Sequence, residues 1–168
     1  MKLAPNRFDA EFDAQSEKPG EQRLEKMVSG RYMGELFGMA IAELLGEKGK
    51  KYGFTSIDMS NIILDETAGL TEVGRIVSAK TGHDLEEVDR QRLQELASAL
   101  VVRSARIVTA TYVGIIWQLA GDDAIKKQHI AIDGSVYEKM PLAKENIMRA
   151  LSERLGESAS LVDTVLEN

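Results

Sequence analysis

The sequence predicts a helix-rich α/β protein that ends in a strand–helix–strand unit. Apolar residues recur at three- and four-residue steps along residues 19–46 and 85–120, which is the spacing of amphipathic helices. Residues 128–132 and 161–166 are short apolar runs typical of strands, and the amphipathic segment 142–155 lies between them. Strand, helix and strand in this order form a β-α-β-like unit.

The composition of the chain excludes several classes of function. The 168 residues, of which 43% are hydrophobic and 29% charged, are enough for one domain with a packed core. The net charge of −6 argues against a general nucleic-acid binder. The chain has no cysteine, which excludes disulfides and thiolate chemistry. His83 and His129 are far apart in the sequence and show no zinc-ligand spacing, so no metal site is predicted.

The sequence predicts a cytoplasmic protein without a membrane span. The first residues contain no apolar run of the kind found in a signal peptide. Residues 99–119 are long enough to cross a bilayer, but Arg103 and Arg106 lie within them. Each such charge costs about 2.5–3.5 kcal/mol near a helix centre. We therefore expect a buried helix of a soluble core.

Helix signals set the remaining boundaries. Residues 1–18 are polar and predict an irregular or short helical lead-in. Pro19 is expected to open the first long helix, because its missing N–H costs nothing in a first turn, and Gly46–Gly49 to end it. Residues 52–69 show no clear periodicity and are predicted to be a connection. A short helix over 71–80 should stop at Gly82, and Asp84 should cap the second long helix.

Three features could carry chemistry. Glu21 and Glu25 would share one helix face, where carboxylates can accept hydrogen bonds from ligand hydroxyls. Their spacing alone favours a solvated acidic first turn. A turn at residues 133–135 follows the first predicted strand and is either a ligand site or an ordinary turn.

The third feature is a row of glycines, Gly30, Gly34 and Gly38, at four-residue spacing. Each costs about 1 kcal/mol relative to alanine within a helix, so a backbone or a ligand should approach closely there. Tight helix packing is the favoured interpretation at Gly34 and Gly38. Gly30 lies beside Arg31, which can pair with phosphate, and is the more ligand-like position.

Two stretches resemble the hexokinase family. Residues 21–36 read EQRLEKMVSGRYMGEL and are similar to the family's PG-x-Q-x-x-EKM-[IV]-[SG]-G-x-Y-[LM]-GE segment. Residues 130–137 read IAIDGSVY and are similar to a later strand and turn of the family. Arg103–Arg106 and the lead-in from Arg7 to Ser16 also resemble the family, so the resemblance covers nearly the whole chain, least around residues 50–82.

The resemblance implies a partial actin-like, ribonuclease-H-like fold. Residues 1–168 would form a single partial domain, the middle of a hexokinase large lobe truncated at both ends. Hexokinases phosphorylate glucose or another hexose at the 6-hydroxyl with Mg-ATP, the first step of glycolysis. By position, Glu25 resembles the carboxylate that binds the hexose, and Gly30, Arg31 and Ser60 resemble residues on the nucleotide side.

Other family motifs are absent from this sequence. These are the two phosphate loops, the Asn-Asp-Thr stretch that holds the general base, and the sugar motif N-x-EW. No catalytic or metal-binding role is therefore assigned to any residue, and the chain alone is expected to be inactive. Its partners would be a hexose and either the rest of a hexokinase chain or a partner or second copy that covers the exposed core. The alternative is a non-catalytic helical interaction or regulatory module derived from a hexokinase lobe.

Overall fold

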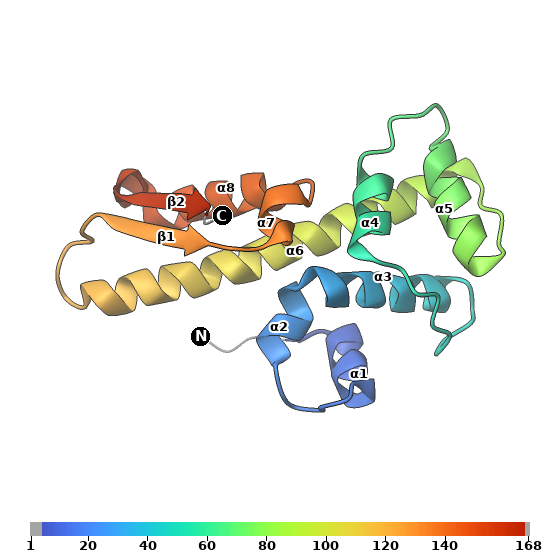
Figure 1. Ribbon diagram of the computed structural model, residues 1–168, viewed down its shortest axis with the longest axis horizontal. Helices are drawn as coiled ribbons and strands as arrows, with labels where there is room; N and C mark the ends of the chain where they lie inside the picture. The colour runs from blue at the N-terminus through green and yellow to red at the C-terminus, as the bar shows by residue number, and fades with distance from the viewer. Residues whose placement is uncertain (1–4, 167–168) are drawn as a thin grey trace. The chain divides into compact units, whose positions relative to one another are not determined.

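The computed structural model describes residues 5–166 and divides into two compact units (Figure 1). The first unit ends at Val101 and the second begins at Val102, within one long helix.

The first unit is built from helices. They are α1 (Arg7–Gln15), α2 (Arg23–Val28), α3 (Gly30–Leu44), α4 (Ser56–Ile63), α5 (Thr71–Thr81) and the first part of α6 (Glu87–Ala120). As predicted, α3 ends before Gly46 and α5 ends at Gly82, and both glycines have the positive φ that favours glycine after a helix. The helix α6 begins at Glu87, so the prediction that Asp84 caps it was wrong. The Asp84 carboxylate instead accepts a hydrogen bond from the Ser78 hydroxyl at 3.1 Å.

The predicted long helix over 19–46 was also wrong, because it is two helices. Ser29 separates α2 from α3 with extended backbone (φ −73°, ψ 147°), and its hydroxyl accepts the Tyr32 N–H. A serine side chain can replace a helical hydrogen bond in this way, whereas the apolar spacing continues across the break. The helix α2 starts at Arg23 rather than at Pro19, after Gln22 in the left-handed region.

The helix α4 falls in the stretch that was predicted to be a connection. It is only eight residues long, too short for apolar periodicity to be recognised. Its start is fixed by a capping box. The Thr55 hydroxyl accepts the Asp58 N–H at 3.2 Å, and the Asp58 carboxylate accepts the Thr55 N–H at 2.7 Å.

Aromatic and aliphatic side chains from α3, α4 and α5 form the core of the first unit. Phe37 and Phe54 meet edge to face with ring centroids 5.3 Å apart. The chain before α4 crosses α3 directly over Gly34, where an added Cβ would lie 2.5 Å from the Phe54 carbonyl oxygen. The tight packing predicted for this glycine is therefore confirmed, and it brings residues 52–56 against α3.

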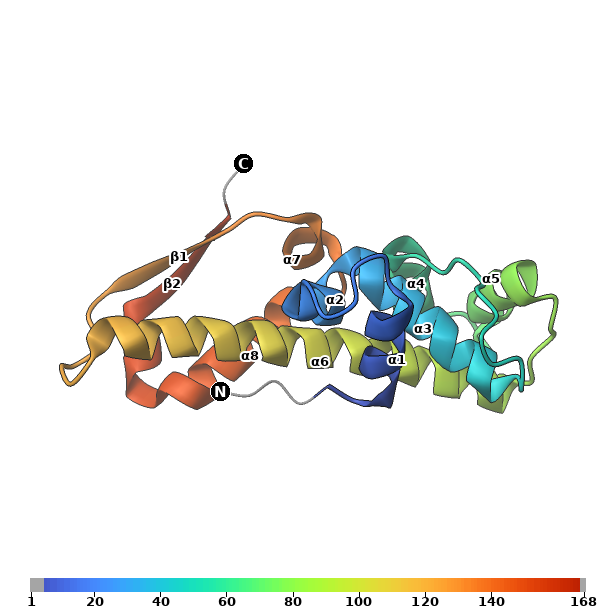
Figure 2. The same ribbon diagram turned by 90° about the horizontal axis from the view of Figure 1, so that it is seen from below.

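The second unit contains the predicted strand–helix–strand. It comprises β1 (Gln128–Ile132), α7 (Ser135–Lys139), α8 (Ala143–Leu155), the 3₁₀ segment η1 (Gly156–Leu161), β2 (Val162–Leu166) and the second part of α6. The two strands lie side by side and are parallel (Figure 1), with α6 and α8 on one side of them (Figure 2). In their register Gln128 pairs with Val162. Apolar residues of α8 and α6 pack together beneath them, including Ile147, Leu151 and Val113.

Several large apolar side chains of this unit are exposed to solvent. Ile115, Trp117 and Leu119 on α6 are 51%, 55% and 68% exposed. By length and composition α6 could cross a membrane, but core helices of soluble proteins meet the same criterion, and 33% of its apolar window is buried. The expected burial of this helix thus holds for part of its surface only.

Candidate functional site

A cleft of about 740 Å³ opens on the first unit. One wall is formed by the end of α1, the loop to α2 and the start of α2. The other wall is formed by the first turns of α3 and the loop before α4. The lining residues include Phe12, Gln15, Glu17, Gln22, Glu25, Arg31, Glu35, Tyr52, Phe54 and Thr55.

Glu25, the predicted hexose-binding residue, is one of the residues that line the cleft. It lies in the first turn of α2, is exposed and lines the cleft. Across residues 5–166, its carboxylate takes part in no hydrogen bond or ion pair with another side chain. Both oxygens are therefore free to accept hydrogen bonds from a ligand.

Gln22, three residues before Glu25, lines the same wall. It was not identified from the sequence as a candidate site residue. Its backbone is left-handed (φ 52°), which is uncommon for a residue other than glycine. An amide side chain offers both donors and acceptors beside the Glu25 carboxylate. Its position directly before the start of α2 could have pointed to it. That position could not be recognised, because the helix was predicted to begin at Pro19.

Glu21, the other carboxylate considered, is not among the residues that line the cleft. It precedes α2 and lies 3.9 Å from the exposed Lys18 ammonium. The two carboxylates therefore do not share one helix face, and the expected pair is not formed.

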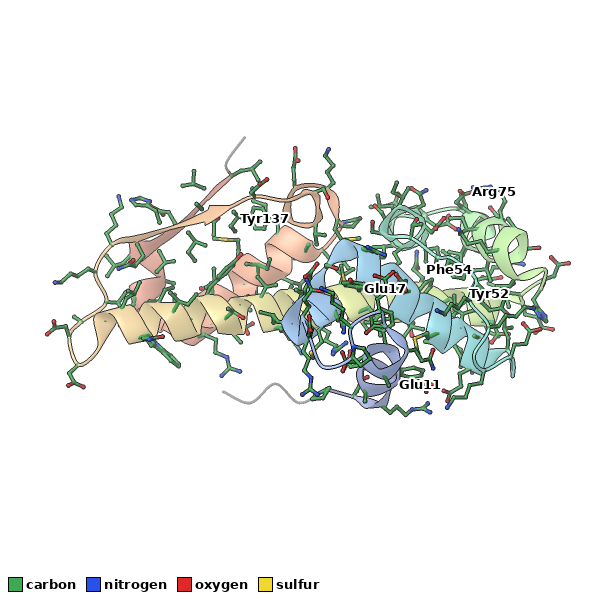
Figure 3. All side chains as sticks on the ribbon, turned by 60° about the horizontal axis from the view of Figure 1, so that its bottom comes forward. Glu11, Glu17, Tyr52, Phe54, Arg75 and Tyr137 are labelled. Atoms are coloured by element: carbon green, nitrogen blue, oxygen red, sulfur yellow. The ribbon has the colours of Figure 1, made fainter. Side chains whose placement is uncertain are left out.

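The opposite wall contains aromatic and basic side chains. Tyr52 and Phe54 lie near each other, with ring centroids 6.4 Å apart (Figure 3). The Glu47 carboxylate accepts hydrogen bonds from the Tyr52 hydroxyl and from Lys50, and lies 3.4 Å from His83 Nε2. The hydrogen bond from Lys50 lowers the pKa of Glu47, so this carboxylate stays ionised.

The three residues assigned to the nucleotide side occupy different positions. Arg31 lines the cleft, with its side chain 75% exposed and 3.8 Å from Glu35. Gly30 is the buried first residue of α3. Ser60 lies on α4 one turn beyond Ser56, which lines the cleft, while Ser60 is outside the lining residues.

The remaining sequence candidate, the turn at residues 133–135, lies in the second unit between β1 and α7. Gly134 adopts φ 134°, ψ 139°, a conformation that favours glycine, and Ser135 begins α7. In the part of the chain that the structure describes, no group of three or more acidic or histidine side chains could hold a metal ion.

The fold is that of part of the large lobe of hexokinases. A crystal structure of a hexokinase aligns with 99% of this chain and 38% of its own, with a TM-score of 0.80 and 22% identity. A hexokinase from Schistosoma mansoni complexed with glucose aligns with 96% of this chain and 38% of its own, with a TM-score of 0.81 and 21% identity. These alignments establish the fold.

The sequence establishes the family. The family model described as hexokinase matches residues 1–167, and the chain belongs to the hexokinase family. Hexokinase-2 of Candida albicans is 30% identical over 98% of this chain and 36% of its own length. Hexokinase-7 of Oryza sativa subsp. japonica is 32% identical over 91% of this chain and 36% of its own. The chain thus spans about a third of the length of the curated relatives it matches.

Proposed function

We propose that the cleft of the first unit is part of the hexose- and nucleotide-binding site of a hexokinase. In this proposal the Glu25 carboxylate accepts hydrogen bonds from hexose hydroxyls, and the Gln22 amide contacts the same sugar. The observation that carries the proposal is the free Glu25 carboxylate in the cleft wall. The resemblance of residues 21–36 to the family's segment, in which the glutamate binds the sugar, supports it.

The nucleotide would lie toward α3 and α4. Arg31 lines the cleft and its guanidinium can pair with phosphate oxygens. Gly30 and Ser60 are assigned to this side by their family positions only. Hexokinases use Mg-ATP, but the described residues offer no metal-binding cluster, so other parts of a hexokinase would hold the ion.

Catalysis would require groups that this sequence lacks. Phosphoryl transfer depends on positioning, charge neutralisation and an aligned nucleophile, and the sequence has neither the general-base motif nor the phosphate loops. We expect the 168 residues to bind hexose weakly and to transfer no phosphoryl group by themselves. A base alone is worth roughly 10²–10⁴-fold in rate.

Glu25→Gln tests the hexose assignment. The substitution keeps the shape and removes a charged acceptor, which is worth about 1.5–3 kcal/mol or roughly 10- to 100-fold in affinity. Glucose affinity is measured by titration of the 168-residue chain, and as KM in any longer polypeptide found to contain it. Glu21→Gln, an exposed carboxylate four residues away, is the matched control and should leave the affinity within about twofold. Equal affinities for the wild type and Glu25→Gln would refute the assignment.

A non-catalytic interaction or regulatory module is the second candidate function. It is favoured by the exposed apolar side chains of α6, Ile115, Trp117 and Leu119, which the rest of a hexokinase chain, a partner or a second copy would cover. In this case the chain would bind no glucose and would form a stable complex.

A further inference from the structure

Lys26 is a charged residue on the buried side of α2. Its side chain is 5% exposed, and its Nζ lies 2.6 Å from Asp13 Oδ1 and 2.7 Å from the Lys18 carbonyl oxygen. An ammonium removed from water is stable only when its donors are paired. Both partners precede α2 in the chain, so Lys26 joins α2 to the end of α1 and to the loop between them.

The second oxygen of the Asp13 carboxylate fixes the same loop. Asp13 Oδ2 accepts the Gly20 N–H at 2.9 Å. The Arg23 guanidinium is a more distant neighbour, 3.9 Å away and 69% exposed. The hydrogen bonds from Lys26 and Gly20 lower the pKa of Asp13, so the carboxylate is ionised at neutral pH. One partly buried ion pair thus reaches α1, the loop and α2.

The loop has little other support. Residues 17–25 are all exposed, and a Cβ added at Gly20 would meet no atom within 4 Å. Gly20 and Gln22 both have positive φ, and no side chain caps the start of α2. A left-handed glutamine persists only where its surroundings fix it. The ties made by Asp13 and Lys26 supply that constraint at both ends of the segment 18–26.

We propose that the Asp13–Lys26 pair is a positioning element that holds Gln22 and Glu25 in the cleft wall. Asp13 has no predicted contact with the hexose. It acts through the loop that carries Gln22 and through Lys26, the neighbour of Glu25 in α2. This inference rests on the hexose site proposed above and adds to it the residues that fix its geometry.

Three variants separate positioning from simple stabilisation. Asp13→Leu leaves the buried Lys26 ammonium without its charged partner, and Lys26→Met leaves the partly exposed Asp13 carboxylate without its nearest cation. Both should lower the free energy of unfolding, and Asp13→Leu should lower it more. The double variant, Asp13→Leu with Lys26→Met, leaves no unpaired buried charge and should regain most of that stability. It still lacks the Gly20 tie. We expect its glucose affinity to stay at least about tenfold below the wild type and its Gly20 amide to exchange faster.

Arg23→Gln is the control. It removes the exposed neighbour of Asp13 from outside the cleft lining and should change neither glucose affinity nor Gly20 exchange. A double variant that regains both stability and wild-type glucose affinity would overturn the positioning role. So would unchanged Gly20 exchange in that variant, whatever its affinity.

The outcomes also distinguish this inference from the proposed function. If the wild type binds no glucose but the double variant still exposes the Gly20 amide, the hexose assignment fails and the role of the pair in holding the loop is supported. If the wild type binds glucose, Glu25→Gln weakens it and the double variant does not, the hexose site stands and the positioning role is overturned.

Discussion

Any side chain at Gly34 would clash, because the backbone of residues 54 and 55 crosses α3 at this position. An alanine Cβ there would lie 2.5 Å from the Phe54 carbonyl oxygen and 2.8 Å from the Thr55 backbone. We expect Gly34→Ala to destabilise the chain by about 1–3 kcal/mol, because these contacts cannot be relieved by rotating a side chain. Denaturant unfolding measures the effect.

Gly38→Ala is the matched control, four residues further along the same helix. Its Cβ would lie 3.4 Å from the Phe54 ring, an ordinary contact. Alanine is favoured over glycine within a helix by about 1 kcal/mol, so this variant should be neutral or more stable. Equal losses at the two positions would contradict the account of Gly34.

The site could be predicted from the sequence only in part, as Glu25 and Gln22 show. Glu25 was reached through a resemblance, because an acidic residue in a first helical turn has no distinctive spacing. Gln22 was missed because neither its left-handed backbone nor its place in the cleft lining leaves a mark in the apolar spacing.

Short helices in this fold depend on their caps. Thr55→Ala removes the acceptor for the Asp58 N–H at the start of α4. We expect a loss of about 0.5–2 kcal/mol in the free energy of unfolding. Thr55→Ser keeps the hydroxyl and should retain most of the stability. A Thr55→Ala chain as stable as the wild type would show that packing alone fixes α4.

The start of α5 depends on a buried carboxylate. Asp65 accepts hydrogen bonds from the Thr67 hydroxyl at 2.6 Å and from the Val73 N–H at 2.8 Å. Burial acts to raise the pKa of Asp65, but these hydrogen bonds outweigh it and the pKa is lowered. The stabilisation is therefore complete above the unfolded pKa of about 3.9 and is lost as the pH falls through the folded value.

Asp65→Asn tests this linkage. At neutral pH the variant should be less stable than the wild type, and the difference should shrink once the pH falls below about 3.9. Urea unfolding of both chains over a range of pH gives the comparison. A stability difference that does not depend on pH would mean that the charge of Asp65 contributes nothing.

The predicted ends of helices agree with the structure where a single residue type, glycine, determines them. Gly46 and Gly82 follow helix ends as predicted, because each has the positive φ that favours glycine. The strand–helix–strand order was also correct. The break at Ser29 and the helix α4 were missed, because both depend on side chains that bond to the backbone while the apolar pattern runs on or is too short to read.

At the scale of the whole molecule, the described part of the second unit contains a sheet of two parallel strands, and residues of α6 and α8 pack against it. Val165 on β2 and Trp117 on α6 remain exposed. The chain also covers about a third of the length of its hexokinase relatives. We expect the polypeptide isolated from its source to have a mass well above 18.5 kDa. An intact mass of 18.5 kDa with a stable oligomer would favour the interaction module instead.

The most direct test of the central claim is a glucose titration of the isotope-labelled chain followed by NMR. The account predicts that glucose shifts the resonances of residues 17–25, and that Glu25→Gln removes most of these shifts while Glu21→Gln does not. Shifts confined to other segments, or the same shifts in the Glu25→Gln chain, would contradict the assignment of this cleft to the hexose.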